Sequence, residues 1–186
     1  MTGSGRKILS QGDCDSACFL YALANASIVL TEQPAVGNKK WDDLWNEATD
    51  SLLATRPFLR ACTGTAPWDD QNQCLEAIAS KFLGAICKEP LEVKLKEGVD
   101  RRRIGDFVSE TSVVVLDDGN HWYVVVETDG EELYVACSAR LNEVGSAYQE
   151  KRTPSLHRLS NNCFPLEDCR VYKRKFFVVS TQGADQ

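Results

Sequence analysis

The chain has 186 residues, of which 43% are hydrophobic, and a formal net charge of -6 at pH 7. This length fits one domain with a real hydrophobic core, so stability requires neither a metal nor disulfides. The acidic balance argues against a general nucleic-acid binder, which needs a basic surface. No apolar run is long enough to span a membrane, and no secretory leader is visible. These features predict a cytoplasmic protein, or one exported by a route without a cleavable signal.

Helical signals fill the first half of the chain. Apolar residues recur with helical spacing over about residues 16–30, and Asp15 or Ser16 would cap this helix. A second helix is expected over about residues 41–55 and a third over about residues 70–83. The first half is therefore predicted to be a helical part.

The second half changes to the two-residue period of β-strands. Strands are expected, in chain order, at residues 91–96, 112–116, 122–128, 133–137 and 176–180. Asp129-Gly130 predicts a hairpin, and residues 101–108 predict a short helix. Residues 139–168, rich in proline and asparagine, are expected to form a long excursion outside the core. The order predicts one α+β domain, helical over about residues 1–88 and an antiparallel sheet over about 89–186.

The strongest chemical signal surrounds Cys18. This cysteine falls in the first turn of the first predicted helix, where unpaired N–H groups and the helix dipole favour a thiolate. His121 precedes a strongly β-prone run and is the candidate base; His157 lies in the polar excursion and lacks such a setting. Gln11 offers a side-chain amide for the oxyanion that such a reaction creates. A cysteine near a helix start is by itself more often a buried filler, so the hypothesis depends on these residues together.

This arrangement resembles the papain-like thiol hydrolase superfamily, in which a helix-borne cysteine faces a strand-borne histidine. The pattern Gln-Gly-x-x-Asp-x-x-Cys-x-x-Tyr-Ala-x-x-Asn-Ala, which starts at Gln11, is similar to small bacterial papain-fold proteins. The chain also resembles bacteriocin-processing peptidases, through Asp13-Cys14-x-x-Ala17-Cys18 and a Gly-x-His before a hydrophobic strand. The resemblance implies a papain-like fold, with the cysteine-bearing helix packed on an antiparallel sheet.

The two resemblances imply different nucleophiles. The first implies Cys18, and the second implies Cys14, which follows Gln11 more closely than is usual in the family. The predicted helix cap places Cys18 inside the first turn, which favours Cys18. Asp13 and Asp15 lie close in sequence and would oppose a thiolate there. Cys14 stays as the alternative nucleophile, or as a resolving thiol beside the site.

One departure from the family concerns the residue that orients the histidine. Relatives carry Asp or Asn after the histidine strand, whereas hairpin pairing here brings Cys137-Ser138 near that place. Ser138 is the expected orienting residue, and Asn142, Asp117 and Asp118 are alternatives. A Cys-His dyad would still work at a reduced rate, because a cysteine thiolate is intrinsically nucleophilic.

The function predicted from these residues is a cysteine hydrolase, most readily a peptidase, that cleaves an amide, isopeptide or thioester bond in a peptide or protein. The alternative is a catalytically weak or inactive papain-fold binding module, which the missing acid favours. A third interpretation gives Cys14 and Cys18 a redox or metal role. The spacings Cys14-x3-Cys18 and Cys163-x5-Cys169 lack the usual zinc pattern, so no metal or other cofactor is expected.

Overall fold

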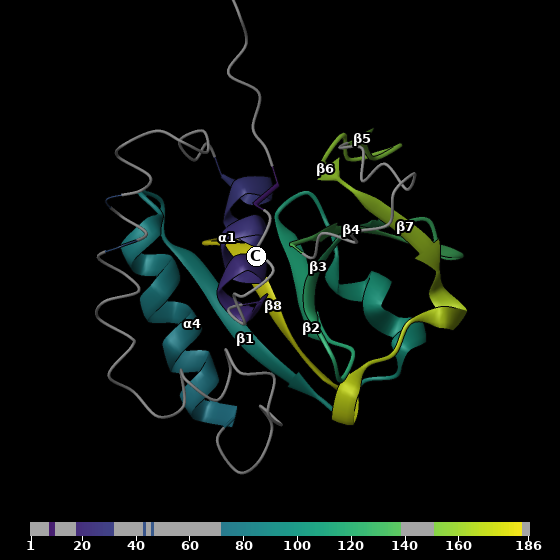
Figure 1. Cartoon of the computed structure of the whole chain (residues 1–186), viewed down its shortest axis with the longest axis horizontal. Helices are drawn as coiled ribbons and strands as arrows, with labels where there is room; N and C mark the ends of the chain where they lie inside the picture. Colours follow the sequence, from purple (N-terminus) through teal and green to yellow (C-terminus); the bar gives the residue numbers. More distant parts are fainter. Residues whose placement is uncertain are drawn as a thin grey trace, which may run out of the picture.

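Helices precede strands along the chain. The computed structural model describes residues 8–9, 18–31, 43, 46, 72–138 and 151–183. Its main elements are α1 (Cys18–Leu30), α4 (Asn72–Ile86), β1 (Leu91–Glu97), β2 (Ser112–Asp117), β3 (Trp122–Thr128), β4 (Glu132–Cys137), β7 (Asn162–Pro165) and β8 (Lys175–Thr181). The shorter ones are β5 (Lys151–Arg152), β6 (Leu159–Ser160) and the 3-10 helices η1 (Arg101–Phe107), η2 (Leu166–Asp168) and η3 (Tyr172–Arg174). The predicted α+β class is confirmed (Figure 1).

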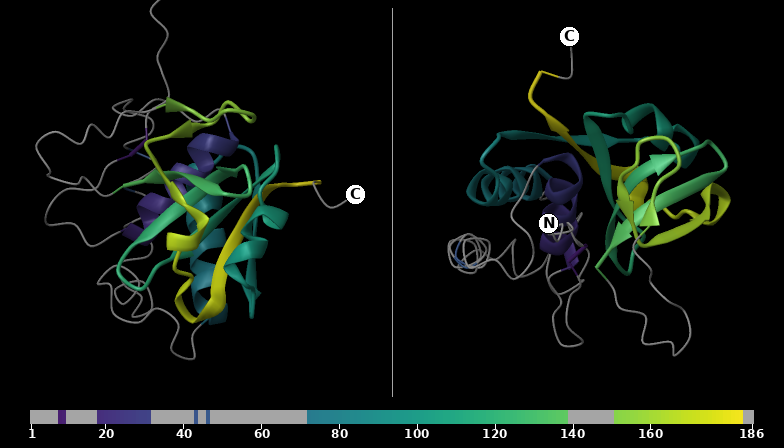
Figure 2. Two further views of the ribbon diagram at one scale, coloured as in Figure 1. Left: turned by 90° about the vertical axis from the view of Figure 1, so that its right-hand side faces the viewer. Right: turned by 90° about the horizontal axis from the view of Figure 1, so that it is seen from above.

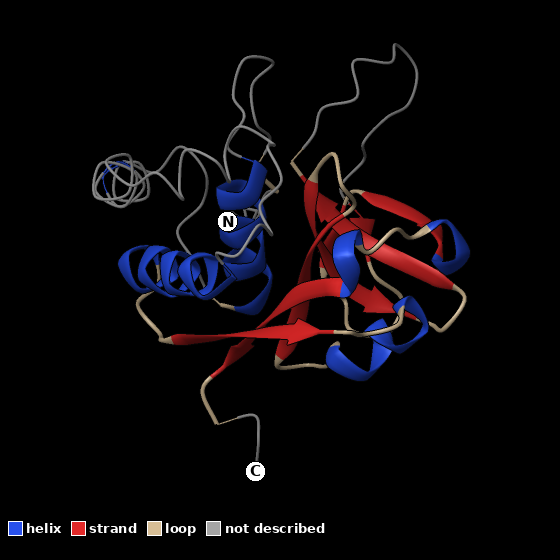
Figure 3. Ribbon diagram, turned by 90° about the horizontal axis from the view of Figure 1, so that it is seen from below, coloured by secondary structure: helices blue, strands red, loops and turns tan. Residues whose placement is uncertain are grey.

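Six of the described strands form one antiparallel sheet in the order β1-β8-β2-β3-β4-β7. β2 and β3 are central, and β3 pairs with β4 so that Tyr123 lies opposite Cys137. Figures 2 and 3 show α1 and α4 against one face of the sheet and short helical segments on the other side. The loop of residues 118–121, which joins the two central strands, therefore lies at one end of the sheet.

Both faces of the central strands are buried. The face toward the helices carries Val113, Val115, Trp122, Val124, Val126, Phe177 and Val179. The opposite face carries Val114, Leu116, Tyr123, Val125, Leu133, Val135, Cys137 and Phe176, together with Ile104 and Cys169 from outside the sheet. This explains why β3 reads as a continuous apolar run rather than as an alternating pattern.

Helix α1 is enclosed on nearly all sides, which differs from the one-sided apolar stripe expected of a surface helix. Its buried residues are Cys18, Phe19, Leu20, Ala22, Leu23, Ala24, Asn25, Ala26, Ser27 and Ile28. In Figure 1 the helix lies between α4 and β3. The Phe19 ring packs on Trp122 with a centroid distance of 4.7 Å and on Phe177 at 5.9 Å. This aromatic cluster anchors the first turn of α1 to the sheet.

Part of the predicted excursion belongs to the core, which corrects the expectation for residues 139–168. β7 pairs with β4 at the edge of the sheet, and Leu159 is buried. Asparagine and proline disfavour strands, but Pro165 ends an edge strand, where a missing N–H donor is tolerated.

Two buried charged side chains hold this segment in place. The Glu127 carboxylate accepts the N–H groups of Ser155 at 2.9 Å and Leu156 at 2.7 Å. The Arg158 guanidinium donates to the carbonyls of Ser112 and Val126 at 3.0 and 2.9 Å. These bonds join residues far apart in sequence, so local sequence patterns do not reveal them.

The remaining predicted elements agree in kind with the structure. The third predicted helix is α4, shifted a few residues toward the C-terminus, and residues 101–107 form η1. The predicted helix of residues 41–55 lies outside the described residues except for Asp43 and Asn46, which are both helical. At the hairpin, Gly130 adopts a φ of +96°, and Asp129 accepts the N–H groups of the following turn. No helix in the described part of the chain is long and apolar enough to cross a membrane.

Asn25 ties the chain that precedes Cys18 to the middle of α1. Its fully buried amide accepts the N–H of Leu9 at 2.7 Å and donates to the Leu9 carbonyl at 3.2 Å. We expect Asn25→Ala to lower the free energy of unfolding by about 2–4 kcal/mol, because both Leu9 groups lose their partners in a buried site. Urea denaturation measures this loss. The control is Ser27→Ala, which removes a smaller buried polar group of the same helix, a hydroxyl that donates to the carbonyl of Ala24; equal losses in the two variants would contradict the role of Asn25.

Candidate active site

Cys18 is the first described residue of α1, and its side chain lies against the start of β3. Only 6% of the residue is exposed. The backbone N–H of Trp122 donates a hydrogen bond to the sulfur, and the N–H groups of Phe19 and Cys18 also stabilise its charged form. The sulfur is therefore held between the start of a helix and the residue that directly follows His121.

The surroundings of Cys18 favour the neutral thiol. Burial raises the pKa of the Cys18 thiol above its ordinary value of 9.0, and the backbone N–H of Trp122 opposes this effect without cancelling it. The negative charge of Asp117, a buried residue at the end of β2, raises that pKa further. At neutral pH the sulfur therefore keeps its proton, and a nearby base has to remove it before or during attack.

The loop between β2 and β3 fixes the main chain of His121. The Asp118 carboxylate accepts the N–H groups of Asn120 at 2.8 Å and His121 at 2.9 Å, and the Asp118 N–H donates to the His121 carbonyl at 3.2 Å. Gly119 adopts a φ of +98°, which favours glycine, and its N–H donates to Asp117 at 2.7 Å. The sequence Asp-Asp-Gly-Asn-His thus forms its own hydrogen-bonded turn and holds the histidine at the start of β3.

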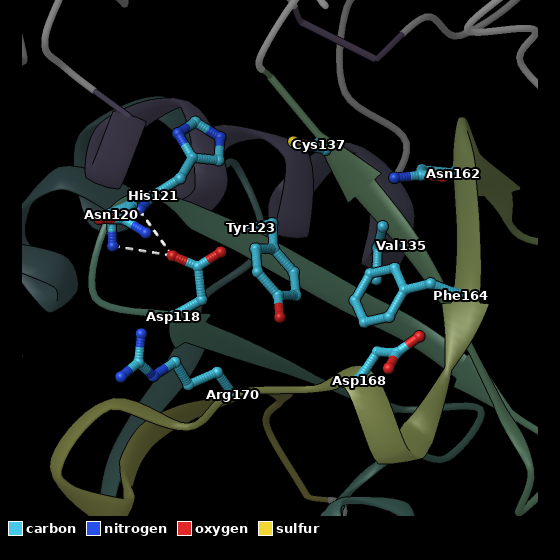
Figure 4. Close-up of a pocket in the computed structure, with 10 residues that line it drawn as sticks. All are labelled: Asp118, Asn120, His121, Tyr123, Val135, Cys137, Asn162, Phe164, Asp168 and Arg170. Carbon is cyan, nitrogen blue, oxygen red and sulfur yellow. Dashed lines mark hydrogen bonds between the residues drawn. The ribbon is translucent and has the colours of Figure 1, made fainter. Parts of the chain in front are cut away.

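The imidazole of His121 is neutral at pH 7. Burial lowers its pKa from the ordinary 6.5, and the charge of Asp118 only partly offsets this. Its Nε2 atom is buried and has no hydrogen-bond partner among the described residues. In Figure 4 the ring is drawn in front of α1, at the same end of the sheet as Cys137. A neutral imidazole has one nitrogen that accepts a proton, as a base must.

Ser138, the predicted orienting residue, is buried directly after β4. It does not bond to Nε2 of His121, since that atom has no partner in the described part of the chain. The acidic residue in contact with His121 is Asp118, which binds the backbone and not the ring. Gln11, Cys14 and Asn142 lie outside the described residues, so the oxyanion donor and the choice between Cys18 and Cys14 stay predictions.

His157 lies at the other end of α1. It is exposed, and the small cavity that it lines also contains Ile28 and Val29. Ile28 is ten residues after Cys18 in the helix, a separation of ~15 Å along the axis. His157 is therefore not a partner for Cys18, whereas His121 directly precedes Trp122, whose N–H bonds to the Cys18 sulfur.

A cavity of about 420 Å³ opens beside His121, on the face of the sheet opposite α1 (Figure 4). Its floor consists of the buried residues Tyr123, Val135 and Cys137. The half-buried Phe164 of β7 forms a wall, with its ring centroid 5.8 Å from that of Tyr123. Half-buried Asp118 and the exposed residues Asn120, Asn162, Asp168 and Arg170 complete the lining. An apolar floor with polar groups around it suits the side chain of a substrate.

Sequence reasoning missed two parts of this site. It did not foresee that Asp117 would act on the charge of Cys18, because that effect depends on both groups being buried together. It also missed the cavity, whose Phe164 and Asp168 come from the segment expected to lie outside the core. The alternation of side chains along β3 is one sequence signal for the cavity, because Tyr123 must lie on the opposite face of the sheet from Trp122.

The described cysteines show neither disulfides nor a metal site. Cys18, Cys87, Cys137, Cys163 and Cys169 are free thiols. No group of three or more His, Cys, Asp or Glu side chains in the described part of the chain is placed to hold a metal ion.

No protein family model, curated protein or solved structure matches this chain. A papain-like assignment therefore has no support from a relative. What the site does has to follow from the residues that form it.

The lowered pKa of His121 predicts a pH-dependent stability. The unfolded chain binds a proton at His121 more readily than the folded chain does, so the free energy of unfolding falls as the pH drops below 6.5. One such group contributes at most about 1.4 kcal/mol per pH unit. We expect His121→Gln to lose less stability than the wild type between neutral pH and mild acid, as measured by urea denaturation. The control replaces the exposed His157 by Gln; parallel curves for wild type and His121→Gln would contradict the burial of a neutral imidazole.

Proposed function

We propose that this chain is a papain-like cysteine hydrolase that cleaves an amide, isopeptide or thioester bond, most readily in a peptide. Cys18 is the proposed nucleophile and His121 the proposed base. One observation carries the proposal. The sulfur at the start of a buried helix accepts a hydrogen bond from Trp122, the residue next to a histidine with a free, buried ring nitrogen.

In the proposed reaction, the sulfur of Cys18 attacks the substrate carbonyl carbon while His121 takes the thiol proton. The oxyanion accepts the N–H of Cys18, with the amide of Gln11 as the expected second donor. His121 then gives its proton to the leaving amine or thiol as that group departs, which leaves a thioester on Cys18. Water attacks the thioester, His121 takes the proton of that water, and the carboxylic acid product leaves as the thiol is restored.

The pKa directions support general-base catalysis and argue against a stable thiolate–imidazolium pair. Burial raises the pKa of Cys18 and lowers that of His121, so both groups are neutral at rest. A neutral imidazole is the form that accepts a proton, and it remains available throughout the neutral range. The N–H groups around the sulfur then stabilise the negative charge as it develops.

Because Nε2 of His121 has no partner among the described residues, the proposed catalytic pair is a dyad without a third, orienting side chain at that atom. Papain-like relatives place an Asp or Asn after the histidine strand, where it orients the ring. Here Nε2 has no partner among the described residues, and the fixed turn around Asp118 holds the backbone of His121 instead. Orientation of the ring by its main chain is weaker than by a direct bond, so we expect a slow enzyme.

Alkylation by iodoacetamide at neutral pH, mapped by peptide mass spectrometry, tests the dyad. We expect His121→Ala to slow the labelling of Cys18 by about 10- to 100-fold, because the base that removes the thiol proton is lost. Two other cysteines are internal controls whose labelling should not change. Burial raises the pKa of Cys87 to about 12, and the exposed Cys163 on the edge strand β7 bonds to Glu132.

Two results would overturn parts of this proposal. Labelling of Cys14 that depends on His121 would keep the hydrolase but replace the nucleophile. Labelling of Cys18 at the same rate with and without His121 would remove the dyad. After the second result, a binding module would be the better-supported function.

The second candidate function is a weakly active or inactive papain-fold binding module. The burial of Cys18 and the negative charge of Asp117 both favour it, since each disfavours the thiolate that attacks. The absence of a bond to Nε2 of His121 within the described residues also favours the binding module.

Asp117→Asn tests how strongly this carboxylate disfavours the thiolate, by removing the charge while keeping an oxygen that can accept the N–H of Gly119. Because the carboxylate raises the pKa of Cys18, we expect the variant to label at Cys18 at least about threefold faster. The matched control is Glu110→Gln, an exposed carboxylate that lines the cavity at the far end of α1. An unchanged rate in Asp117→Asn would show that this charge does not limit the thiol.

A further inference from the structure

Two carboxylates at the cavity beside His121 have no cationic partner among the described residues. Asp118 is half-buried on its inner wall, and Asp168 is exposed at its rim. Neither forms an ion pair with another described residue. Elsewhere in the structure, ion pairs join Lys94 to Glu92, Arg103 to Asp106 and Lys175 to Glu97. The cavity therefore holds negative charge that a ligand can neutralise.

One carboxylate oxygen of Asp118 bonds to the loop, and the other lies on the side of the cavity. Oδ1 accepts the N–H groups of Asn120 and His121. No described group donates to the other oxygen, and Figure 4 shows that oxygen on the side of the Tyr123 ring. A half-buried carboxylate oxygen is a strong acceptor for a charged donor, because little water competes for it.

Arg170 does not cancel this charge at the centre of the cavity. Figure 4 shows its guanidinium below Asp118 and away from Phe164, whereas the Asp168 carboxylate lies below the Phe164 ring; among the described residues Arg170 forms no ion pair with either carboxylate. Arg170 is exposed, so solvent and salt screen its charge more strongly than that of half-buried Asp118. We therefore expect the less screened negative charge of Asp118 to make the cavity prefer a cationic ligand.

The aromatic wall suits a long side chain that ends in a cation. The rings of Tyr123 and Phe164 meet edge to face, at 82° and 5.8 Å between centroids. Such rings pack against the methylene stem of lysine or arginine and attract the charged end through their π faces. A volume of about 420 Å³ leaves room for one such side chain.

We propose that the cavity binds a lysine or arginine side chain of the substrate, with Tyr123 and Phe164 against its stem and Asp118 and Asp168 at its cationic end. As a specificity site for cleavage, this inference rests on the proposed function, because the proposed base His121 also lines the cavity. The enzyme would then select substrates that are basic beside the scissile bond.

Binding of small amides tests the site without requiring turnover. The probes are N-acetyl-lysine amide and N-acetyl-norleucine amide, which share a similar stem and differ in the charged end. Affinities come from NMR titration of the Tyr123 and Phe164 ring signals in the full chain. We expect the lysine probe to bind about tenfold more tightly, and Asp118→Asn to remove that preference while keeping an oxygen for the loop N–H groups.

The controls separate a charge effect from damage to the fold. Asp168→Asn is expected to weaken lysine binding about threefold, because the rim charge is screened. Asp106→Asn, an exposed carboxylate that pairs with Arg103 outside the cavity, should leave binding unchanged. Equal binding of the two probes, or a lysine preference that survives in Asp118→Asn, would overturn the inference.

Labelling of Cys18 in the same samples distinguishes this inference from the proposed function. If Cys18 labelling depends on His121 but the probes bind equally, the hydrolase stands and the specificity site is wrong. If the lysine probe binds as expected while Cys18 labelling ignores His121, the cation site stands and the hydrolase is wrong.

Discussion

The burial of α1 on the central strands is the constraint on which the rest of the structure depends. Its first turn is anchored by Phe19, whose ring packs on Trp122 and Phe177. Asn25 fixes the preceding chain by two hydrogen bonds to Leu9. Cys18 therefore cannot move relative to β3 without disturbing the core, because close-packed interiors resist such shifts. The contact between its sulfur and the backbone of Trp122 follows from this packing.

The same burial that positions Cys18 also limits its reactivity. Removing the thiol from water penalises its charged form, and the nearby Asp117 adds to that penalty. His121 is likewise kept neutral, although the charge of Asp118 works in the other direction. In the proposed mechanism, such a pair stays uncharged until a substrate binds and negative charge develops on the oxyanion. Substrate selectivity would then depend on how tightly a substrate binds in the cavity beside His121.

Local patterns in the sequence predicted most of the helices and strands. The predicted bounds of the 122–128 strand match β3, because its β-branched and aromatic run has no other good conformation. A helix-borne cysteine and a strand-borne histidine are also local features, and packing α1 on β3 brings them to neighbouring positions. The parts that were not predictable depend on non-local pairing. β7 becomes a strand only because β4 offers an edge, and its Phe164 then completes the cavity.

The state of charge at the site could not be predicted from the sequence either. Asp117 and Asp118 are adjacent in the chain, yet one raises the pKa of Cys18 and the other raises that of His121. Which group each carboxylate meets is decided by the turn around Gly119 and by the helix that packs beside it. The sequence alone suggested both aspartates only as alternatives for orienting the ring.

The most direct test of the central claim is to trap the acyl-enzyme. The protein is mixed with a short peptide thioester, quenched in acid, and digested, and the acylated residue is identified by mass spectrometry. We predict a single acyl group on Cys18 that forms in the wild type and is hydrolysed with the help of His121. Acylation of Cys137 or Cys163 instead, or equal acylation of all accessible thiols, would contradict the assignment of Cys18 and His121 as a catalytic pair.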